Sequence, residues 1–323
     1  SIMPSVLVIG AGLSGLACAR AMQTAGWAVT LVDKGRGVGG RLATRRLGAA
    51  AFDTGAQFFT VRSPAFQRQV DDWTDRGLVS IWSHGFDSDD GHPRHMAPGG
   101  MTSLAKDLAV GLDVRCSTMA FTIRPNAAQP SVLSSDDSWQ VVIDDGTEHD
   151  ADAVIVTTPL PQAFALLADS RIDLPDQLMR TDYDRTITLL ATLDRAPAIP
   201  APGGLQGPTP DLSFVADNMA KGVSAAPAIT VHASAGWSEA HWDDEVDDLQ
   251  AALTDLVSAW LGDATIVEAQ VKKWRFATPR TPWPDPCWVA EGGRVVLAGD
   301  AFDGPRVEAA HNSGLAAAHA LVG

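Results

Sequence analysis

The feature that most constrains this chain is a glycine turn between an apolar strand and a helix near its start. Residues 5–33, "SVLVIGAGLSGLACARAMQTAGWAVTLVD", carry Gly10, Gly12 and Gly15 in the pattern G-x-G-x-x-G. In such a pattern the first glycine permits a tight turn, the second lets a pyrophosphate approach the backbone, and the third lets helix and strand pack closely. Asp33 ends the next strand, where an acid grips the ribose hydroxyls of a dinucleotide. The segment predicts a doubly wound dinucleotide-binding domain.

Apolar strands of the same kind recur in the middle and at the end of the chain. "VIVTTP" occupies residues 154–159, and "GGRVVLAGD" occupies residues 292–300, before an alanine-rich final helix. Buried parallel strands carry uninterrupted apolar runs because helices cover both faces of their sheet. One domain followed by another would not spread these strands so widely. We therefore expect the chain to leave the dinucleotide domain twice, build a second domain and return.

The segments between these strands predict a small antiparallel meander. Residues 111–125 are expected to form a strand pair or one bent strand. Residues 138–159 are expected to form two strands, with Asp145-Gly146 as a hairpin turn. The polar residues 126–138 are expected to form the loop between these two segments.

Helices and a further loop are expected elsewhere. Residues 64–82 and 241–262 have helical patterns, and the second begins with acidic residues that suit the positive end of a helix dipole. Residues 195–210 are rich in Pro and Gly and are expected to be a loop. Pro305 is favoured in the first turn of the final helix.

The composition argues against several kinds of partner and site. A formal net charge of −15 disfavours nucleic acid and anionic membrane surfaces. The first apolar run is a short strand, so we expect no signal peptide, and no stretch is long enough to span a bilayer. Three scattered cysteines without a CxxC pair fit the cytoplasm. The eight histidines show no metal-ligand spacing, so we expect no metal.

A second glycine cluster decides which dinucleotide is expected. Residues 34–46, "KGRGVGGRLATRR", carry Gly39 and Gly40 followed by Arg41. An NAD dehydrogenase does not need this cluster. The "GGR" at residues 39–41 resembles that of flavoproteins of the glutathione-reductase and amine-oxidase type, and the resemblance implies that its backbone and arginine touch the pyrophosphate of FAD. The alternative is a basic surface loop.

Several segments together resemble one family. They are "FDTGAQFFT" (52–60), "MAPGGM" (96–101), "VIVTTPLPQA" (154–163), "VKKWRFATPR" (271–280) and "VVLAGDAFDGPRVEAAHNSGLAAAHAL" (295–321). Each resembles the corresponding segment of bacterial renalase-like FAD-dependent oxidoreductases, within the flavin amine oxidase superfamily. The resemblance runs from one end of the chain to the other.

The resemblance implies a non-covalently bound FAD. Asp300 would bind the ribityl chain, although a plain helix-entry acid is an equal alternative. The start of the final helix near Val307 would stabilise the negative charge that develops around flavin N1 and the C2 carbonyl. The residues expected to contact FAD are Gly10, Gly12, Leu13, Ser14, Gly15, Asp33, Lys34, Gly40, Arg41, Ala56, Gln57, Phe58, Met119, Ala120, Thr157, Thr158, Pro159, Trp274, Gly299, Asp300, Arg306 and Val307.

Arg306 departs from the amine-oxidase pattern. In monoamine oxidase-like sequences this position is usually a tyrosine of an aromatic cage for an amine. An arginine would disfavour an ammonium substrate and suit one that carries phosphate. The alternatives are that Arg306 points to solvent or pairs with Asp303 or Glu308. The expected catalytic residues are Arg306, His232, His311, Trp274, Gln57 and Phe58.

Some of these residues could instead have a purely structural role. His232 on an apolar strand and His311 on a helix are both consistent with structural histidines. Trp274 is a platform for a flat ring or simply a core side chain.

These patterns together predict an α/β flavoprotein with a glutathione-reductase-like FAD domain bearing a β-meander and a discontinuous substrate domain with an antiparallel sheet and helices. The expected FAD domain comprises residues 1–62, 98–163 and 291–323, and the expected substrate domain comprises residues 63–97 and 164–290.

The resemblance implies oxidation of 1,2- or 1,6-dihydro-NAD(P) to NAD(P)+, with hydride transfer to flavin N5 and reduction of O2 to hydrogen peroxide. The alternatives are an FAD-dependent amine oxidase or desaturase-like enzyme, and a redox-silent FAD-binding regulatory protein. The sequence leaves the substrate isomer, the preference between NAD and NADP, and the oligomeric state open.

Overall fold

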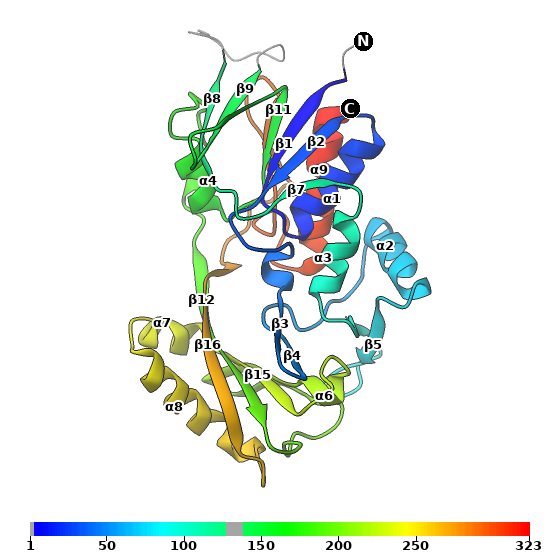
Figure 1. Cartoon of the computed structure of the whole chain (residues 1–323), viewed down its shortest axis with the longest axis vertical. Helices are drawn as coiled ribbons and strands as arrows, with labels where there is room; N and C mark the ends of the chain where they lie inside the picture. The colour runs from blue at the N-terminus through cyan, green and yellow to red at the C-terminus, as the bar shows by residue number, and fades with distance from the viewer. Residues whose placement is uncertain (1–2, 127–137) are drawn as a thin grey trace. The chain divides into compact units, whose positions relative to one another are not determined.

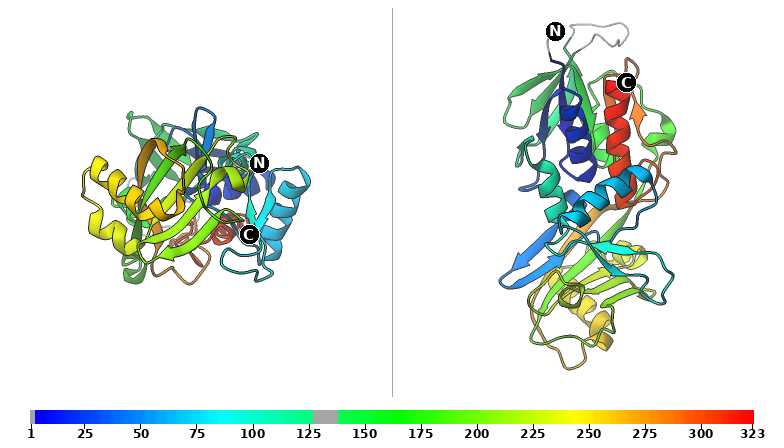
Figure 2. Two further views of the ribbon diagram at one scale, coloured as in Figure 1. Left: turned by 90° about the horizontal axis from the view of Figure 1, so that it is seen from below. Right: turned by 90° about the vertical axis from the view of Figure 1, so that its right-hand side faces the viewer.

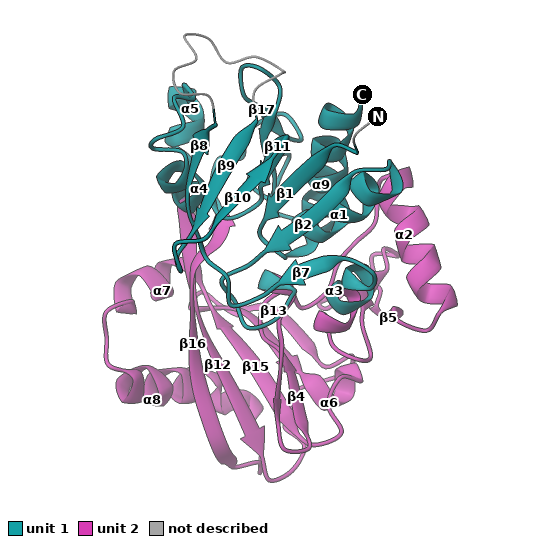
Figure 3. Ribbon diagram, turned by 45° about the horizontal axis from the view of Figure 1, so that its top comes forward, with its two compact units in different colours: residues 1–40, 105–182, 279–323 teal, residues 41–104, 183–278 magenta. Residues whose placement is uncertain are grey.

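The computed structural model describes residues 3–126 and 138–323, which fall into two compact units (Figure 3). Unit 1 comprises Ser1–Gly40, Ala105–Asp182 and Pro279–Gly323, and unit 2 comprises Arg41–Leu104 and Tyr183–Thr278. The chain therefore leaves unit 1 twice. These units divide the chain at other points than the expected FAD and substrate domains do, because residues 41–62, for example, lie in unit 2. The assignment of FAD and substrate binding to domains stays a prediction.

Unit 1 is built on a six-stranded sheet that confirms the doubly wound fold class. Its order is β17-β18-β11-β1-β2-β7, and every neighbouring pair is parallel except β17 with β18. The central strands are buried, as their apolar sequences require. The strands are β1 (Ser5–Ile9), β2 (Ala28–Val32), β7 (Asp113–Arg115), β11 (Ala153–Val156), β17 (Trp288–Val289) and β18 (Val295–Leu297).

Two long helices of unit 1, α1 (Leu13–Thr24) and α9 (Val307–Val322), lie side by side (Figures 1 and 2). Gly314 makes this contact possible, because a Cβ there would lie 2.2 Å from the carbonyl oxygen of Ser14. The placement of Pro305 in the first turn of this helix was wrong. Arg306 is the N-cap in extended conformation, so Pro305 precedes the helix and fixes the chain that enters it. The shorter helices are α4 (Leu160–Leu166) and α5 (Asp176–Met179).

The meander is present, but it draws on fewer residues than expected. Its antiparallel order is β10-β9-β8, formed by β8 (Ala120–Pro125), β9 (Trp139–Ile143) and β10 (Glu148–Ala151). The Asp145-Gly146 turn is confirmed, with Gly146 at φ +86°. Residues 111–125 form two strands in different sheets, since β7 pairs with β2. Residues 138–159 form three strands rather than two, because β11 joins the parallel sheet. Most of the expected polar loop, residues 127–137, lies outside the described residues.

Unit 2 is built on a five-stranded sheet with the order β13-β14-β15-β12-β16. One face packs against α7 (Ala235–His241) and α8 (Val246–Val257), whose Leu249, Leu253 and Val257 bury against alternate strand residues. The other face packs Leu190 and Ala228 against Phe52. The strands are β12 (Tyr183–Leu193), β13 (Gly204–Thr209), β14 (Leu212–Asp217), β15 (Ala228–Ala233) and β16 (Ile266–Pro279).

Three expected boundaries in unit 2 were wrong. The helix expected over residues 64–82 ends at Asp75, because Gly77 adopts φ +77°, and a strand follows. The loop expected over residues 195–210 contains β13, an edge strand that tolerates Pro208. The helix expected over residues 241–262 is shorter at both ends, as α8 followed by η2 (Ser258–Trp260).

Eight further helices and strands are described. They are η1 (Gly40–Leu42), β3 (Thr44–Leu47), β4 (Ala50–Asp53), α2 (Pro64–Asp75), β5 (Ser80–Ser83), β6 (Arg94–Met96), α3 (Thr102–Ala109) and α6 (Asn218–Lys221). Among the described residues, no helix has both the length and the apolar character that crossing a membrane requires.

Candidate functional site

Two of the three glycines in the first turn are required by the packing of unit 1 itself. Gly10 has φ +108°, and a Cβ there would lie 2.3 Å from Thr157 Oγ1. A Cβ at Gly15 would lie 1.9 Å from the carbonyl oxygen of Gly10. The first glycine therefore serves the turn, and the third serves the contact between helix and strand.

Gly12 is different, because neither its conformation nor its protein neighbours call for glycine. Its φ of −79° and ψ of −174° are open to any residue. Apart from its chain neighbours, the described residue nearest to a Cβ there would be Gly39, whose carbonyl oxygen would lie 3.9 Å away. Close approach of a ligand to the backbone remains as a reason for glycine at this position.

The start of α1 fits an anionic ligand. Gly12 caps the helix without a side-chain hydrogen bond, and the first turn, from Leu13, holds no acidic residue. The Ser14 hydroxyl is buried and has no hydrogen-bond partner among the described residues. Exposed amides at a helix start bind pyrophosphate well, so these residues fit the pyrophosphate of FAD.

Asp33 ties the two glycine clusters together. Its Oδ2 accepts a hydrogen bond from the Ala11 amide, and its Oδ1 accepts one from the Gly35 amide, both at 2.7 Å. The Gly39 amide donates to the Ala11 carbonyl at 2.9 Å, so the second cluster, with Lys34 and Gly40 in the same stretch, lies against the first. Each carboxylate oxygen keeps a further lone pair, which suits a ribose hydroxyl.

The segments after β7 and β11 bring further expected residues to this turn. The Thr157 hydroxyl donates to the Ile9 and Gly10 carbonyls at 3.0 and 3.2 Å, and the buried Thr158 hydroxyl has no hydrogen-bond partner in the described chain. Pro159 is the N-cap of α4. The Thr118 amide donates to the Asp33 carbonyl at 2.8 Å. Met119 and Ala120 follow directly, and Met119 is exposed.

The C-terminal turn lies beside the same sheet. Gly299 has φ +133°, and its amide donates to the buried Ser313 hydroxyl at 2.9 Å, which fixes the turn to α9. Asp300 is half-buried after it, and Val307 is half-buried at the helix start.

Arg306 and His311 differ in accessibility. Arg306 is exposed and makes no ion pair with a described residue, so pairing with Asp303 or Glu308 is not observed. His311 is 3% exposed, its Nδ1 lies 3.1 Å from Asn312 Oδ1, and burial lowers its pKa. This setting fits the structural alternative for His311.

In unit 2, two expected residues, His232 and Trp274, meet at the carbonyl of Thr54. His232 Nε2 lies 2.9 Å from this oxygen, and Trp274 Nε1 donates to it at 3.3 Å. A carbonyl only accepts, so His232 carries its proton on Nε2. Burial is the main cause that lowers the pKa of His232 to about 4; the charge of Lys221 acts in the same direction, and the hydrogen bond to Thr54 acts against it. The ring is therefore neutral near pH 7.

Arg41 and Ala56 belong to the same cluster. The Ala56 amide donates to the Arg41 carbonyl at 2.9 Å, and Arg41 Nη1 donates to the Phe276 and Ala277 carbonyls at 3.3 Å. A Cβ at Gly55 would lie 2.2 Å from the Arg41 carbonyl oxygen, so the turn needs glycine.

The two aromatic residues expected to contact a ligand are each partly covered by protein. Lys272 Nζ lies 3.9 Å from the centre of the Trp274 ring and covers one face, so a flat ligand could not stack on that face. Phe58 packs against Phe86 and Phe214, with ring centres 5.1 and 5.7 Å apart, and Trp82 completes this aromatic cluster.

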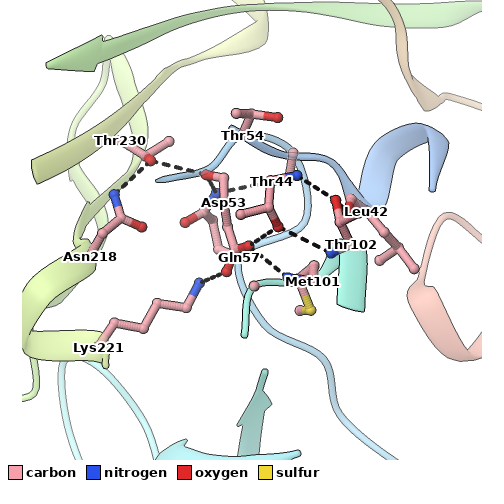
Figure 4. Close-up of polar contacts among 12 residues, drawn as sticks. Leu42, Thr44, Asp53, Thr54, Gln57, Met101, Thr102, Asn218, Lys221 and Thr230 are labelled. Carbon is pink, nitrogen blue, oxygen red and sulfur yellow. Dashed lines mark hydrogen bonds and ion pairs between the residues drawn. The ribbon is translucent and has the colours of Figure 1, made fainter. Parts of the chain in front are cut away.

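A buried ion pair in unit 2 has no signal in the sequence (Figure 4). Lys221 Nζ lies 2.9 Å from Asp53 Oδ2, and both side chains are completely buried. Asp53 Oδ1 accepts hydrogen bonds from the Thr44 hydroxyl at 2.9 Å and the Met101 amide at 2.8 Å. Asp53 begins the recognisable D-x-G-A-Q stretch, but nothing around Lys221 marks it as its partner.

The environment of His232 predicts a pH dependence. The unfolded chain binds a proton with the ordinary pKa of 6.5, and the folded chain binds it only near pH 4. Stability should therefore fall as pH drops from about 6.5 to 4, by at most about 3 kcal/mol. His232→Gln keeps a donor for Thr54 and should flatten this decline, measured by urea unfolding across that pH range. His92→Gln, at an exposed histidine, should leave the slope unchanged.

Comparisons with known proteins agree with this geometry. A family model described as flavin containing amine oxidoreductase matches residues 71–322, and one described as NAD(P)-binding Rossmann-like domain matches residues 8–73. Renalase from Mus musculus is 29% identical over 180 residues. That alignment covers 52% of this chain and 50% of the relative, so the match spans about half of the relative's length.

Two solved structures resemble the whole chain. A protein assigned as a protoporphyrinogen oxidase, from Exiguobacterium sp. 255-15, has a TM-score of 0.73 at 13% identity, covering 99% of this chain and 98% of its own. Wild-type putrescine oxidase bound to putrescine has a TM-score of 0.68 at 16% identity, covering 98% of both chains. At this identity the likenesses show the fold alone.

Proposed function

The chain belongs to the family of flavin-containing amine oxidoreductases, whose cofactor is FAD, and on that premise we propose that it oxidises dihydronicotinamide dinucleotides. The substrates would be 1,2- or 1,6-dihydro-NAD(P), the product NAD(P)+, and the electron acceptor O2, which becomes hydrogen peroxide. The observation that carries this proposal is Arg306, an exposed cation at the N-cap of α9 without an ion pair to a described residue. The similarity to renalase supports it.

Several residues present here fit FAD. Gly12, Leu13 and Ser14 offer open backbone and a buried hydroxyl to the pyrophosphate, and Asp33 offers acceptors to a ribose. When bound, FAD supplies the hydride-accepting ring. The other expected contacts, among them Asp300 and Trp274, stay proposed.

The local charge of Arg306 favours a phosphate-bearing substrate over an amine. Arg306 would attract phosphate and repel an ammonium group. His232 is neutral and already holds its proton against the Thr54 carbonyl, so hydride transfer would not draw on it as an acid. We therefore assign positioning, rather than proton transfer, to the residues of this chain.

Oxidation of an amine is the second candidate. The family description and the putrescine-bound structural relative favour it, and so does the cluster of Phe58, Trp82, Phe86 and Phe214, since aromatic faces attract cations.

Anaerobic reduction of the yellow FAD-loaded protein tests the proposal. We expect 1,2- or 1,6-dihydro-NAD(P) to bleach the flavin in stopped-flow mixing within seconds, while putrescine and ordinary 1,4-NADH do so far more slowly. Bleaching by amines but not by the isomers would establish the second candidate instead. A flavin that none of these compounds reduces would point to a regulatory, redox-silent protein.

A further inference from the structure

The side-chain amide of Gln57 is buried in unit 2 in one fixed orientation. The residue is 5% exposed, and its Nε2 donates to the carbonyl oxygens of Asp53 at 2.8 Å and Gly55 at 3.0 Å. Both of these partners are acceptors, so the nitrogen must face them. Gln57 Oε1 is therefore directed away from the segment that holds the amide.

Gln57 Oε1 is a buried acceptor without a donor. It has no hydrogen-bond partner among the residues that the structure describes. Buried polar atoms nearly always have a partner, because an unsatisfied one loses its hydration without replacement. Such an atom points to a donor that the described part of the chain does not provide.

The support of this amide is unusually firm (Figure 4). The carboxylate of Asp53 is held by the Met101 amide and the Lys221 ammonium group. The backbone carbonyl of Asp53 also accepts a hydrogen bond from the Thr230 hydroxyl at 3.0 Å. That hydroxyl in turn accepts a hydrogen bond from Asn218 Nδ2 at 3.0 Å. Rotation of the Gln57 amide would break two hydrogen bonds to this scaffold.

The donors of the neighbouring side chains are already engaged. His232 Nε2 and Trp274 Nε1 both point at the Thr54 carbonyl. Lys221 binds Asp53 and lies 4.7 Å from the centre of the Trp82 ring. Lys221 and Gln57 both bind Asp53, so the buried ammonium group of Lys221 also disfavours a cationic donor at Gln57 Oε1.

We propose that Gln57 Oε1 accepts a hydrogen bond from an amide-type N–H of a bound planar ring. Two groups of the proposed reaction carry this chemistry, the imide N–H of the flavin and the carboxamide N–H of the nicotinamide substrate. Phe58, which follows Gln57 in the chain and is half-buried, is an aromatic side chain against which a planar ring could pack. The inference rests on the proposed function for the identity of the ring.

Ligands in which the N–H is replaced by N–CH3 test the proposal and separate the two sources. The pairs are FAD with 3-methyl-FAD, and NAD+ with its N,N-dimethylcarboxamide analogue, each measured by equilibrium binding. In the wild-type protein the N–H form of one pair should bind about fivefold more tightly. In Gln57→Met this preference should vanish for that pair and stay unchanged for the other.

Gln67→Met, the same substitution at an exposed glutamine of α2, serves as the control and should keep the wild-type preference. If the wild-type protein prefers neither N–H form, the inference is overturned without recourse to any variant. A preference that survives in Gln57→Met overturns it too. Both outcomes are independent of flavin bleaching by dihydronicotinamides, which alone decides the proposed function.

Discussion

Replacing Lys221 with methionine is expected to lower the free energy of unfolding by about 3–5 kcal/mol. The substitution leaves the Asp53 carboxylate completely buried with no cation, supported only by neutral donors such as the Thr44 hydroxyl and the Met101 amide. A lone buried charge costs far more than the pair contributes. Urea and thermal unfolding of the full FAD-loaded chain would measure the loss.

The double variant Asp53→Asn/Lys221→Met provides the matched comparison. It removes both charges together, so most of the stability lost in Lys221→Met should return. Arg76→Met breaks an exposed ion pair with Asp72 in the same unit and should cost less than about 1 kcal/mol. A Lys221→Met protein as stable as Arg76→Met would show that the buried pair does not matter for folding.

Gly12→Ala is expected to leave the fold intact and to weaken FAD binding about 10- to 100-fold. Beyond the chain neighbours of Gly12, the added methyl meets no described atom closer than 3.9 Å, and the backbone of Gly12 suits alanine. The methyl group would weaken the binding free energy of FAD by about 1–3 kcal/mol, because it occupies the space that the pyrophosphate must approach. Reconstitution of the apoprotein, followed by flavin fluorescence, would measure the affinity.

Gly15→Ala is the contrasting variant. Its methyl would lie 1.9 Å from the Gly10 carbonyl oxygen, so the strand and helix must separate even without a ligand. We expect apoprotein with this change to unfold at much lower urea concentration, whereas Gly12→Ala apoprotein should match the wild type. Wild-type FAD affinity in Gly12→Ala, or equal instability of the two apoproteins, would contradict a ligand-based role for Gly12.

The parallel sheet was predictable because its signals are local. The run that ends in Ile9, the glycine turn and the strand that ends in Val32 each carry their own pattern, and the structure pairs them as expected. Element ends were less predictable. Gly77 ends α2 through its positive φ, and the Pro-rich segment becomes β13 because the neighbouring β14 offers it a partner. Propensity could not foresee pairing between segments so different in composition.

The candidate site, too, was predictable only in part from the sequence. The pattern identifies Gly10, Gly12 and Gly15 together, but only the structure distinguishes Gly12, which has room for a methyl group, from the two glycines that do not. Likewise, the sequence predicts His232 and Trp274 as site residues, but their meeting at the Thr54 carbonyl depends on two different strands.

The sequence by itself determined the dinucleotide-binding fold, since the turn, the strands and the acid at Asp33 act over short separations. Only the tertiary structure decided which polar groups satisfy one another. Asp53 and Lys221 form an ion pair across 168 residues, and Gln57 Oε1 is left as a buried acceptor by contacts that no local pattern encodes. The physical reason is desolvation: whether a polar atom needs a partner depends on burial, and burial depends on packing of distant segments.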